Sequence, residues 1–535
     1  MRRVMLGVVQ LSIAQASAVM IGTLVASRIL GWLRLSVIGA QFAGDPRALD
    51  AFWAAFRIPD TLFNLLVAGA LASAFIPVFS SYLAKERERE AWRVASSVMN
   101  AMLIALIALS AIGWVLAPYL VPLVAPEFEP DQLALMTELT RIMLLSPIFM
   151  GLSALFTGVL NSYRQFLSGA TAPLVYNAVI ILFALFAAPF LGIKALAFGV
   201  VAGAAMMWLV QVPELTFRRT RYALALDLSH PGVREIAALA LPTTVRLAVV
   251  QVVLFVDINL SSRMPPGSYT DLLYAFQLTM LPLGVFSIAI SAAVFPTLTR
   301  FASLGQQGRM RDSLEQAIRW ILYLTFPTII VMIVLRRPIV HLLFQYGEFG
   351  DAAREATALA FLFYAIGLAG HAIVQIIARA YYATKDTTTP LVMTVVSIVV
   401  NVVFAILLAP GLGINGLALA NSIATLAEAA LLVIVFAPRA RLRLGSLSVS
   451  TLRHLAASLS MGVAMFAFIR VTNLPLDLAL NPPKPLLLLQ TMIAMAFGAA
   501  VYVIASSVFR APELDEILAV VRARLPFGRK AAAAH

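Results

Sequence analysis

The chain has 535 residues, of which 61% are hydrophobic and only 12% charged, and its mean hydropathy is +0.92. That apolar share lies outside the range of soluble domains and indicates an integral membrane protein. The absence of cysteine excludes disulfides and thiolate chemistry, and the five scattered histidines offer no metal-ligand spacing. The basic residues behind the net charge of +13 lie in short loops between apolar segments, which favours membrane orientation over nucleic-acid binding.

At roughly 20 apolar residues per crossing, a chain of this length holds about fourteen transmembrane helices. Because lipid-exposed backbone must satisfy its hydrogen bonds within each helix, we predict an all-α, polytopic helical bundle. The first apolar run follows Arg2 and Arg3 and continues through Val25, so we interpret it as a retained helix and not as a cleaved signal peptide. In chain order the predicted helices cover 10–40, 51–83, 94–122, 133–161, 172–190, 195–217, 236–262, 271–298, 314–335, 356–381, 388–408, 414–437, 455–472 and 486–508.

The first two predicted helices contain three arginines, Arg28, Arg34 and Arg57. A guanidinium in hydrocarbon costs at least about 2.5 kcal/mol, so these side chains must face protein, water or an anion. A planar guanidinium donates paired hydrogen bonds to phosphate, which predicts an anion-binding cavity suited to a diphosphate. The alternative is that each arginine reaches an interface or pairs with Asp50 or Asp60.

Alternate loops between the predicted helices are basic: 85–93, 218–234, 300–311, 439–453 and the tail 510–530. The opposite loops are poor in Lys and Arg, and the one after the third helix is acidic. By the positive-inside rule both termini are cytoplasmic, which agrees with an even number of crossings.

The two halves of the chain resemble each other. The stretch Ala74–Ser80 matches Ala293–Thr299 at an offset of 219 residues, and Leu191–Ala197 matches Leu412–Ala418 at an offset of 221. Parallel repeats of six helices each would explain both matches, although chance similarity among Leu-, Ala- and Gly-rich helices is the alternative. We therefore predict an N-lobe at 1–220, a C-lobe at 221–440, a further helix pair at 441–510 and a cytoplasmic tail at 511–535.

Ionisable residues in the second half are of mixed sign. Asp257 and Glu428 fall in the middle of predicted helices. Arg246 lies in the same predicted helix as Asp257, and Arg379 lies in the predicted helix 356–381. No phosphate-binding glycine loop, nucleophile elbow or metalloprotease motif occurs in the chain, which disfavours an enzyme.

Several motifs together resemble the MurJ/MviN family. In the N-terminal half they are Ser27–Gly31, Asp50–Pro59 and Gly69–Pro77. In the C-terminal half they are Leu281–Phe286, Phe344–Gly347, Arg379–Ala383 with Lys385-Asp386, and Thr389-Pro390. The resemblance covers about residues 10–440 in order and the motifs are specific in combination.

This resemblance implies a flippase of the multidrug/oligosaccharidyl-lipid/polysaccharide exporter superfamily. Its substrate would be lipid II, the undecaprenyl-diphosphate-linked peptidoglycan precursor, moved to the outer leaflet of the bacterial cytoplasmic (inner) membrane by alternating access. It implies two pseudosymmetric lobes of six helices, and two extra helices that form a groove for the lipid tail. Membrane lipids and cell-wall synthesis enzymes are the other implied partners, and no cofactor is implied.

The resemblance also implies roles for particular residues, with departures from the family pattern. Many members carry an arginine where this chain has Gln277, so Arg246 either supplies the missing charge or forms an ion pair with Asp257. Asp257 and Asn401 are implied as a monovalent cation (Na⁺) site, with the membrane potential as the other candidate for coupling. The implied substrate-binding residues are Arg28, Arg34, Asp50, Arg57, Asp60, Arg246 and Gln277.

Three other functions remain open at the level of sequence. They are a polysaccharide (O-antigen type) lipid flippase, a multidrug exporter of the same superfamily, and a membrane scaffold for cell-wall enzymes. A cation exporter should bury carboxylates in its first half, whereas this chain places arginines there.

Overall fold

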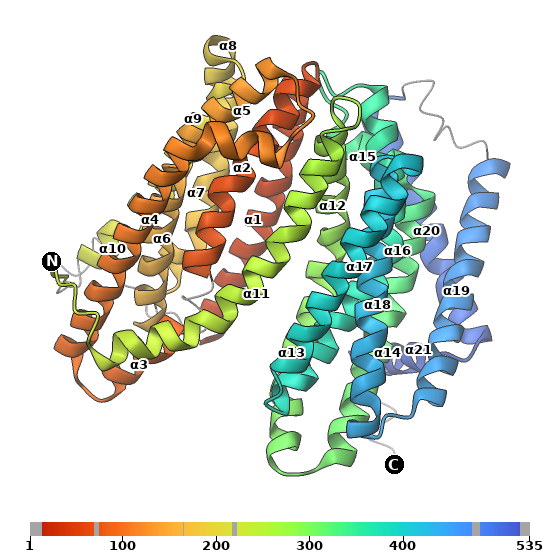
Figure 1. The fold of residues 1–535 in the computed structure, drawn as a ribbon. Coiled ribbons are helices and arrows are strands. Elements are labelled where there is room, and N and C mark those ends of the chain that lie inside the picture. The colour runs from red at the N-terminus through yellow and green to blue at the C-terminus, as the bar shows by residue number, and fades with distance from the viewer. Residues whose placement is uncertain (1–12, 69–73, 164, 217–221, 473–481, 525–535) are drawn as a thin grey trace, which may run out of the picture. The chain divides into compact units, whose positions relative to one another are not determined.

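The computed structural model describes residues 13–68, 74–163, 165–216, 222–472 and 482–524, and every regular element in those ranges is a helix (Figure 1). The predicted start of the first helix, part of the Gly69–Pro77 motif and the end of the tail lie outside them. The elements are α1 (Ile13–Phe42), α2 (Pro46–Phe63), η1 (Asn64–Ala68), α3 (Ile76–Ala84), α4 (Glu88–Val124), α5 (Pro130–Met143), α6 (Ser146–Ser162), α7 (Leu167–Leu182), η3 (Phe183–Ala187), α8 (Ala188–Leu191), α9 (Lys194–Leu209), α10 (Val212–Thr216), α11 (Pro231–Ser261), α12 (Ser268–Val285), α13 (Ser287–Ser303), α14 (Gln307–Val334), α15 (Arg336–Phe344), α16 (Asp351–Ala383), α17 (Thr388–Leu412), α18 (Ile414–Ala440), α19 (Leu444–Val471), α20 (Lys484–Val508) and α21 (Pro512–Arg524).

Within the described ranges, twelve helices or adjoining helix runs are long and apolar enough to cross a membrane. The all-α membrane class is therefore confirmed, and the predicted count of fourteen is approximate. The two predicted segments beyond these twelve are α1 and the run from α2 through η1 to α3. Those are the segments that carry the three arginines, and α2 also contains Asp50 and Asp60.

The chain forms two compact units, 1–270 with 346–350, and 271–345 with 351–535. Helix α11 belongs to the first unit because the segment before it is hydrogen-bonded to α4. The Asn100 side-chain amide donates to the carbonyls of Ala223 and Ala225, at 3.1 and 2.8 Å, and the Ser97 hydroxyl accepts from the Asp227 backbone N–H. These contacts tie the segment before α11 to α4, and the predicted boundary between the N-lobe and the C-lobe at residue 220 stays a prediction.

In the second unit, α16, α17 and α18 pack side by side (Figure 1). Glycines permit the close approach of α16 to α18, since a Cβ on Gly367 would lie 2.6 Å from the Ser422 hydroxyl oxygen. Small residues at contacts between membrane helices are the usual means of such packing. Helices α19 and α20 also pack together, and the Tyr502 hydroxyl of α20 donates to the Tyr323 carbonyl of α14 at 2.7 Å.

One pair of matched sequences also has matched backbone. Gly192 has φ 58° and ψ −145°, and Gly413 has φ 58° and ψ −139°. Each ends one helix and leads directly into the next, and side chains other than hydrogen are strained at such angles. This shared local structure supports the internal duplication that the sequence predicts.

Candidate functional site

Arg34 lies on the inward side of α1 and contacts α7. Its guanidinium carbon is 5.8 Å from the centre of the Tyr176 ring, and its Nε is buried without a hydrogen-bond partner among the described residues. Arg28 lies on the same helix and is exposed. Helix α1 continues without a break through Gly31, so residues six positions apart point about 120° away from each other. The helix is not unwound at Gly31.

Arg57 of α2 is held by two neighbours. It forms a 3.4 Å ion pair with Asp60 and donates a 3.5 Å hydrogen bond to the Tyr269 hydroxyl. Asp60 also interacts electrostatically with Arg34, and Asp257 of α11 interacts with Arg57. For Arg57 the structure therefore shows the alternative that the sequence leaves open, a pairing with Asp60.

These contacts define an arginine cluster in the first unit: Arg34, Arg57, Asp60 and Asp257, with Tyr176 and Tyr269 beside them. The cluster brings together α1, α2, α7, α11 and the start of α12. Its two cations face two anions, so part of its charge is compensated within the protein. In the described part of the chain, no carboxylate lies within 4 Å of the Arg28 or Arg34 guanidinium. Neither arginine is engaged in an ion pair with a described residue, although Asp60 offsets part of the charge of Arg34 at longer range.

Asp50 has different surroundings from the arginines. Its side chain is 2% exposed and accepts three hydrogen bonds: from the Gly267 N–H at 2.7 Å, the Thr270 N–H at 2.9 Å and the Thr270 hydroxyl at 2.7 Å. These donors belong to the beginning of α12, whose first-turn N–H groups have no partner within the helix. The geometry gives Asp50 a structural role as the cap of α12.

The remaining predicted site residues are dispersed. Arg246 is on α11, but its side chain lies outside the described part of the structure. Gln277 is exposed on α12. Asn401 of α17 is 3% exposed and its Oδ1 has no hydrogen-bond partner among the described residues. Asp257 and Asn401 belong to different compact units, so their predicted cation site stays a prediction.

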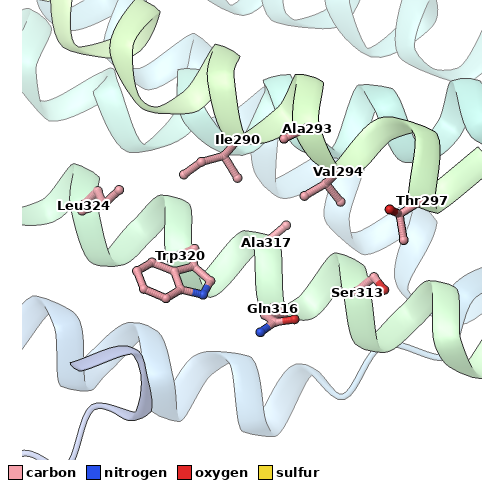
Figure 2. A pocket seen from close by; sticks show the side chains of 9 residues that line it. All are labelled: Ile290, Ala293, Val294, Thr297, Ser313, Gln316, Ala317, Trp320 and Leu324. Atoms are coloured by element: carbon pink, nitrogen blue, oxygen red, sulfur yellow. The ribbon is translucent and has the colours of Figure 1, made fainter. Parts of the chain in front are cut away.

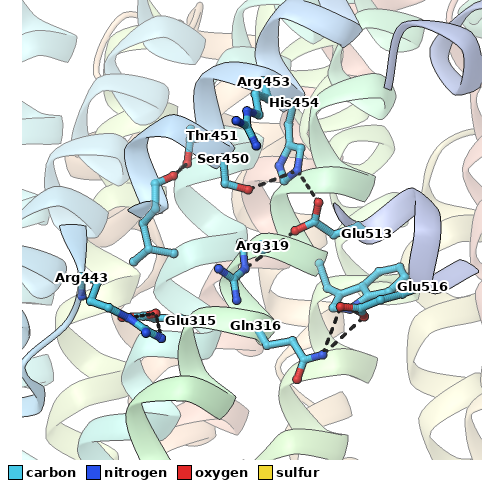
Figure 3. Close-up of polar contacts among 12 residues, drawn as sticks. Glu315, Gln316, Arg319, Arg443, Ser450, Thr451, Arg453, His454, Glu513 and Glu516 are labelled. Carbon is cyan, nitrogen blue, oxygen red and sulfur yellow. Dashed lines mark hydrogen bonds and ion pairs between the residues drawn. The ribbon is translucent and has the colours of Figure 1, made fainter. Parts of the chain in front are cut away.

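A polar network joins the C-terminal helices to α14 (Figure 3). The fully buried Glu315 accepts hydrogen bonds from the backbone and the guanidinium of Arg443, at 2.7 to 3.0 Å. Glu513 of α21 lies 2.8 Å from His454 Nε2 and 3.8 Å from Arg319 Nε. Burial alone would raise the pKa of Glu513, but the hydrogen bond from His454, a backbone hydrogen bond and the charges of His454 and Arg319 together lower the pKa below its usual value. The network fixes α19 and α21 on α14.

A pocket of about 480 Å³ lies between α13 and α14 (Figure 2). Its walls are mostly apolar, with Ile290 and Val294 on one helix and Leu324 on the other. Two further lining residues, Gln316 and Trp320, also donate hydrogen bonds to Glu516 of α21. Figure 3 shows the contact of Gln316 with Glu516. The pocket belongs to the second unit, and none of the predicted substrate-binding residues lines it.

Sequence reasoning missed Tyr176 and Tyr269, the aromatic members of the arginine cluster. Both are tyrosines in largely apolar helices, and a buried tyrosine hydroxyl needs a polar partner. That signal was present in the sequence, but it could not identify which arginine each tyrosine meets.

Comparison with protein families identifies one match over most of the chain. The family model described as lipid II flippase MurJ matches residues 39–481. A probable lipid II flippase MurJ of Rhizobium meliloti is 29% identical over 438 residues, which cover 79% of this chain and 80% of that protein. A lipid II flippase MurJ of Burkholderia cenocepacia is 30% identical over 401 residues, which cover 74% and 78%.

Two solved structures have a similar fold. One is titled lipid II flippase MurJ, inward closed conformation; it has a TM-score of 0.77 and 24% identity and covers 92% of this chain and 98% of its own. The other is the inward-facing conformation of a multidrug resistance MATE family transporter, with a TM-score of 0.65, 16% identity and coverage of 80% and 99%. At these identities the two likenesses show the fold alone.

Proposed function

The chain belongs to the lipid II flippase MurJ family, and we propose that Arg28 and Arg34 bind the diphosphate of lipid II while it crosses the membrane. The chain is a multi-pass membrane protein that moves lipid II, and its membrane-spanning helices contact membrane lipids. The observation that carries the proposal is the lack of a carboxylate within 4 Å of either guanidinium in the described structure, whereas Arg57 has Asp60. In this proposal Arg57 and Asp60 contribute less to binding, because they pair with each other. Asp50 supports transport indirectly, because it holds the start of α12.

The path of the substrate follows from the cost of moving its parts. An isolated diphosphate in hydrocarbon is prohibitively unfavourable, so the headgroup must pass between polar groups by alternating access. The undecaprenyl tail would lose about 0.8 kcal/mol per CH₂ in water, so it stays in lipid. We place the tail beside α19 and α20, and both chain termini in the cytoplasm, as the basic loops favour.

Coupling has two candidates within this proposal. One is a monovalent cation, sodium, at Asp257 and Asn401, and the other is the membrane potential. Electrostatic interaction of Asp257 with Arg57 favours a structural role for this carboxylate. Transport that is independent of sodium, together with an active Asp257→Ala variant, would exclude the cation site. Gln277 and Arg246 stay proposed headgroup contacts, and cell-wall synthesis enzymes stay proposed partners.

The alternative functions are not favoured. The matching family model and the curated relatives are lipid II flippases, and neither a polysaccharide-lipid flippase nor a scaffold explains that match better. A multidrug exporter shares the fold, but Arg28 and Arg34 in the first unit form no ion pair with a described carboxylate. Such a site suits an anionic headgroup better than a cationic drug.

Complementation tests the proposal. Expression of this chain should rescue growth of a bacterial strain depleted of its own lipid II flippase. Arg28→Ala or Arg34→Ala should abolish rescue at matched membrane expression, and lysine should restore it only in part, because an ammonium cannot reproduce the bidentate guanidinium. Failure of the unaltered chain, when it is inserted normally, would count against the function itself.

A further inference from the structure

An ionisable side chain in the second unit has no part in the proposed binding of the headgroup. Glu428 lies in the middle of α18, a helix whose exposed residues include Leu426 and Ile434, at 37% and 62%. With 3.6 residues per turn, Glu428 projects from the side of α18 away from them. Its neighbour α17 likewise exposes Val395 and Val399 and turns Thr394 inward.

Glu428 is part of a row of polar groups. The Thr394 hydroxyl donates to a Glu428 carboxylate oxygen at 2.8 Å. One turn away on α18, the Thr425 hydroxyl is 3.4 Å from His371 Nε2 on α16, and the same ring nitrogen is 3.4 Å from Asn421 Oδ1. Asn421, Thr425 and Glu428 are spaced four and three residues apart, so they occupy one face of α18.

Among the described residues, no cation forms an ion pair with the Glu428 carboxylate. Within the described structure no Lys or Arg lies within 4 Å of Glu428, and α17 contains no charged residue along its length. On α16, Arg379 is turned to the Phe295 ring of α13, at 5.8 Å, and the charged residues Asp351, Arg354 and Glu355 bond to one another or to Arg337 at the far end.

The third helix packed against α18 is α14, and its ionisable groups are engaged elsewhere. Glu315 and Asp312 bind Arg443, while Arg319 lies near Glu513. The nearest titratable group of another helix in the polar row is therefore His371. An unpaired carboxylate in a membrane helix is costly, and uptake of a proton removes that cost.

We propose that Glu428 exchanges one proton with water in each transport cycle, and that this exchange couples flipping to a pH gradient. The inference rests on the proposed function and adds the proton to sodium and the membrane potential as the source of coupling. The step is the transfer of a proton from hydronium to the carboxylate, which leaves water, and its reversal on the other side of the membrane. Thr394 suits this exchange because its hydroxyl donates to the carboxylate and, after rotation, accepts from the protonated acid.

The test uses the full chain in proteoliposomes with a fluorescent lipid II analogue. The membrane potential is held at zero with valinomycin and equal potassium on both sides. A gradient of one pH unit then changes the equilibrium distribution of the analogue about tenfold for each proton coupled. We expect that change in the unaltered protein and in the exposed control Asp515→Asn. Glu428→Gln should flip the analogue without responding to the gradient, and Glu428→Asp should retain a response.

Three results would overturn the inference. They are an equal response of Glu428→Gln and the unaltered protein, no response of the unaltered protein to pH, and a response to a sodium gradient in its place. If Glu428→Gln is not inserted into the membrane, Thr394→Val serves as the second variant, because it keeps the carboxyl group and removes its hydrogen-bond donor. This variant should shift the pH at which flipping is half-maximal. An unchanged dependence of flipping on pH would contradict the inference. No flipping by the unaltered protein under any gradient would refute the proposed function instead.

Discussion

Replacement of Asp50 by alanine tests whether this carboxylate holds α12 or touches substrate. The change leaves two backbone N–H groups and one hydroxyl without an acceptor in a site that is 2% exposed. A buried donor without a partner costs about 1–3 kcal/mol, and since water can enter the space we expect a total of about 3–5 kcal/mol. Asp45→Ala is the matched control, because that exposed cap accepts one bond, from the Ala48 N–H, and is worth about 1 kcal/mol.

Hydrogen exchange of the amides at 267–270 measures the effect locally, with thermal unfolding in the same detergent as the global readout. A difference of about 2 kcal/mol between the variants corresponds to exchange about 30-fold faster in Asp50→Ala. Loss of transport should accompany that increase. If Asp50→Ala lost transport while exchange at 267–270 stayed as slow as in Asp45→Ala, the carboxylate would have to contact substrate.

Further predictions follow from other parts of the fold. Gly192→Ala and Gly413→Ala should each destabilise the protein by about 1–3 kcal/mol, because both positions need the same positive φ. If thermal unfolding showed a destabilisation for only one of the two variants, that result would argue against the internal duplication. Glu315→Gln should lower the melting temperature more than Asp312→Asn. The buried Glu315 accepts from both the backbone and the guanidinium of Arg443, whereas the pair of Arg443 with Asp312 is exposed and worth at most about 1 kcal/mol. Equal shifts would contradict this. Burial would raise the pKa of Asp386, but hydrogen bonds from the first turn of α17 and from α18 outweigh it and lower the pKa. A carboxylate with a depressed pKa stabilises the fold above its unfolded value of about 3.9 and loses that effect as pH falls. The difference in melting temperature between the unaltered protein and Asp386→Asn should therefore shrink from pH 6 to pH 3, and a constant difference would refute the assignment.

Local patterns in the sequence predict the helices and the charges within them. Apolar segment length gives the membrane helices, and the three-residue spacing of Arg57 and Asp60 on one helix gives their ion pair. The repeated Leu-Gly-Ile sequence likewise locates two glycines that share one backbone conformation. Each of these features depends on residues close together in the chain.

Contacts between distant segments could not be predicted. Asp50 binds Gly267 and Thr270, more than 200 positions away, and nothing in the local pattern distinguishes it from a substrate-binding carboxylate. The same holds for Arg34 and Tyr176, which meet because α1 packs against α7. The hydrogen bonds from Asn100 to the carbonyls of Ala223 and Ala225 are a further example, since helix counting does not register them.

Flipping of a fluorescent lipid II analogue by the purified Arg28→Ala, Arg34→Ala double variant tests the central claim most directly. The control removes two exposed arginines outside the arginine cluster, Arg47 and Arg89, so that both proteins lose the same charge. The account predicts that the unaltered chain and the control flip the analogue at similar rates, whereas the double variant is inserted normally and does not flip it. Flipping by the double variant at the control's rate would contradict the claim that these arginines carry the diphosphate.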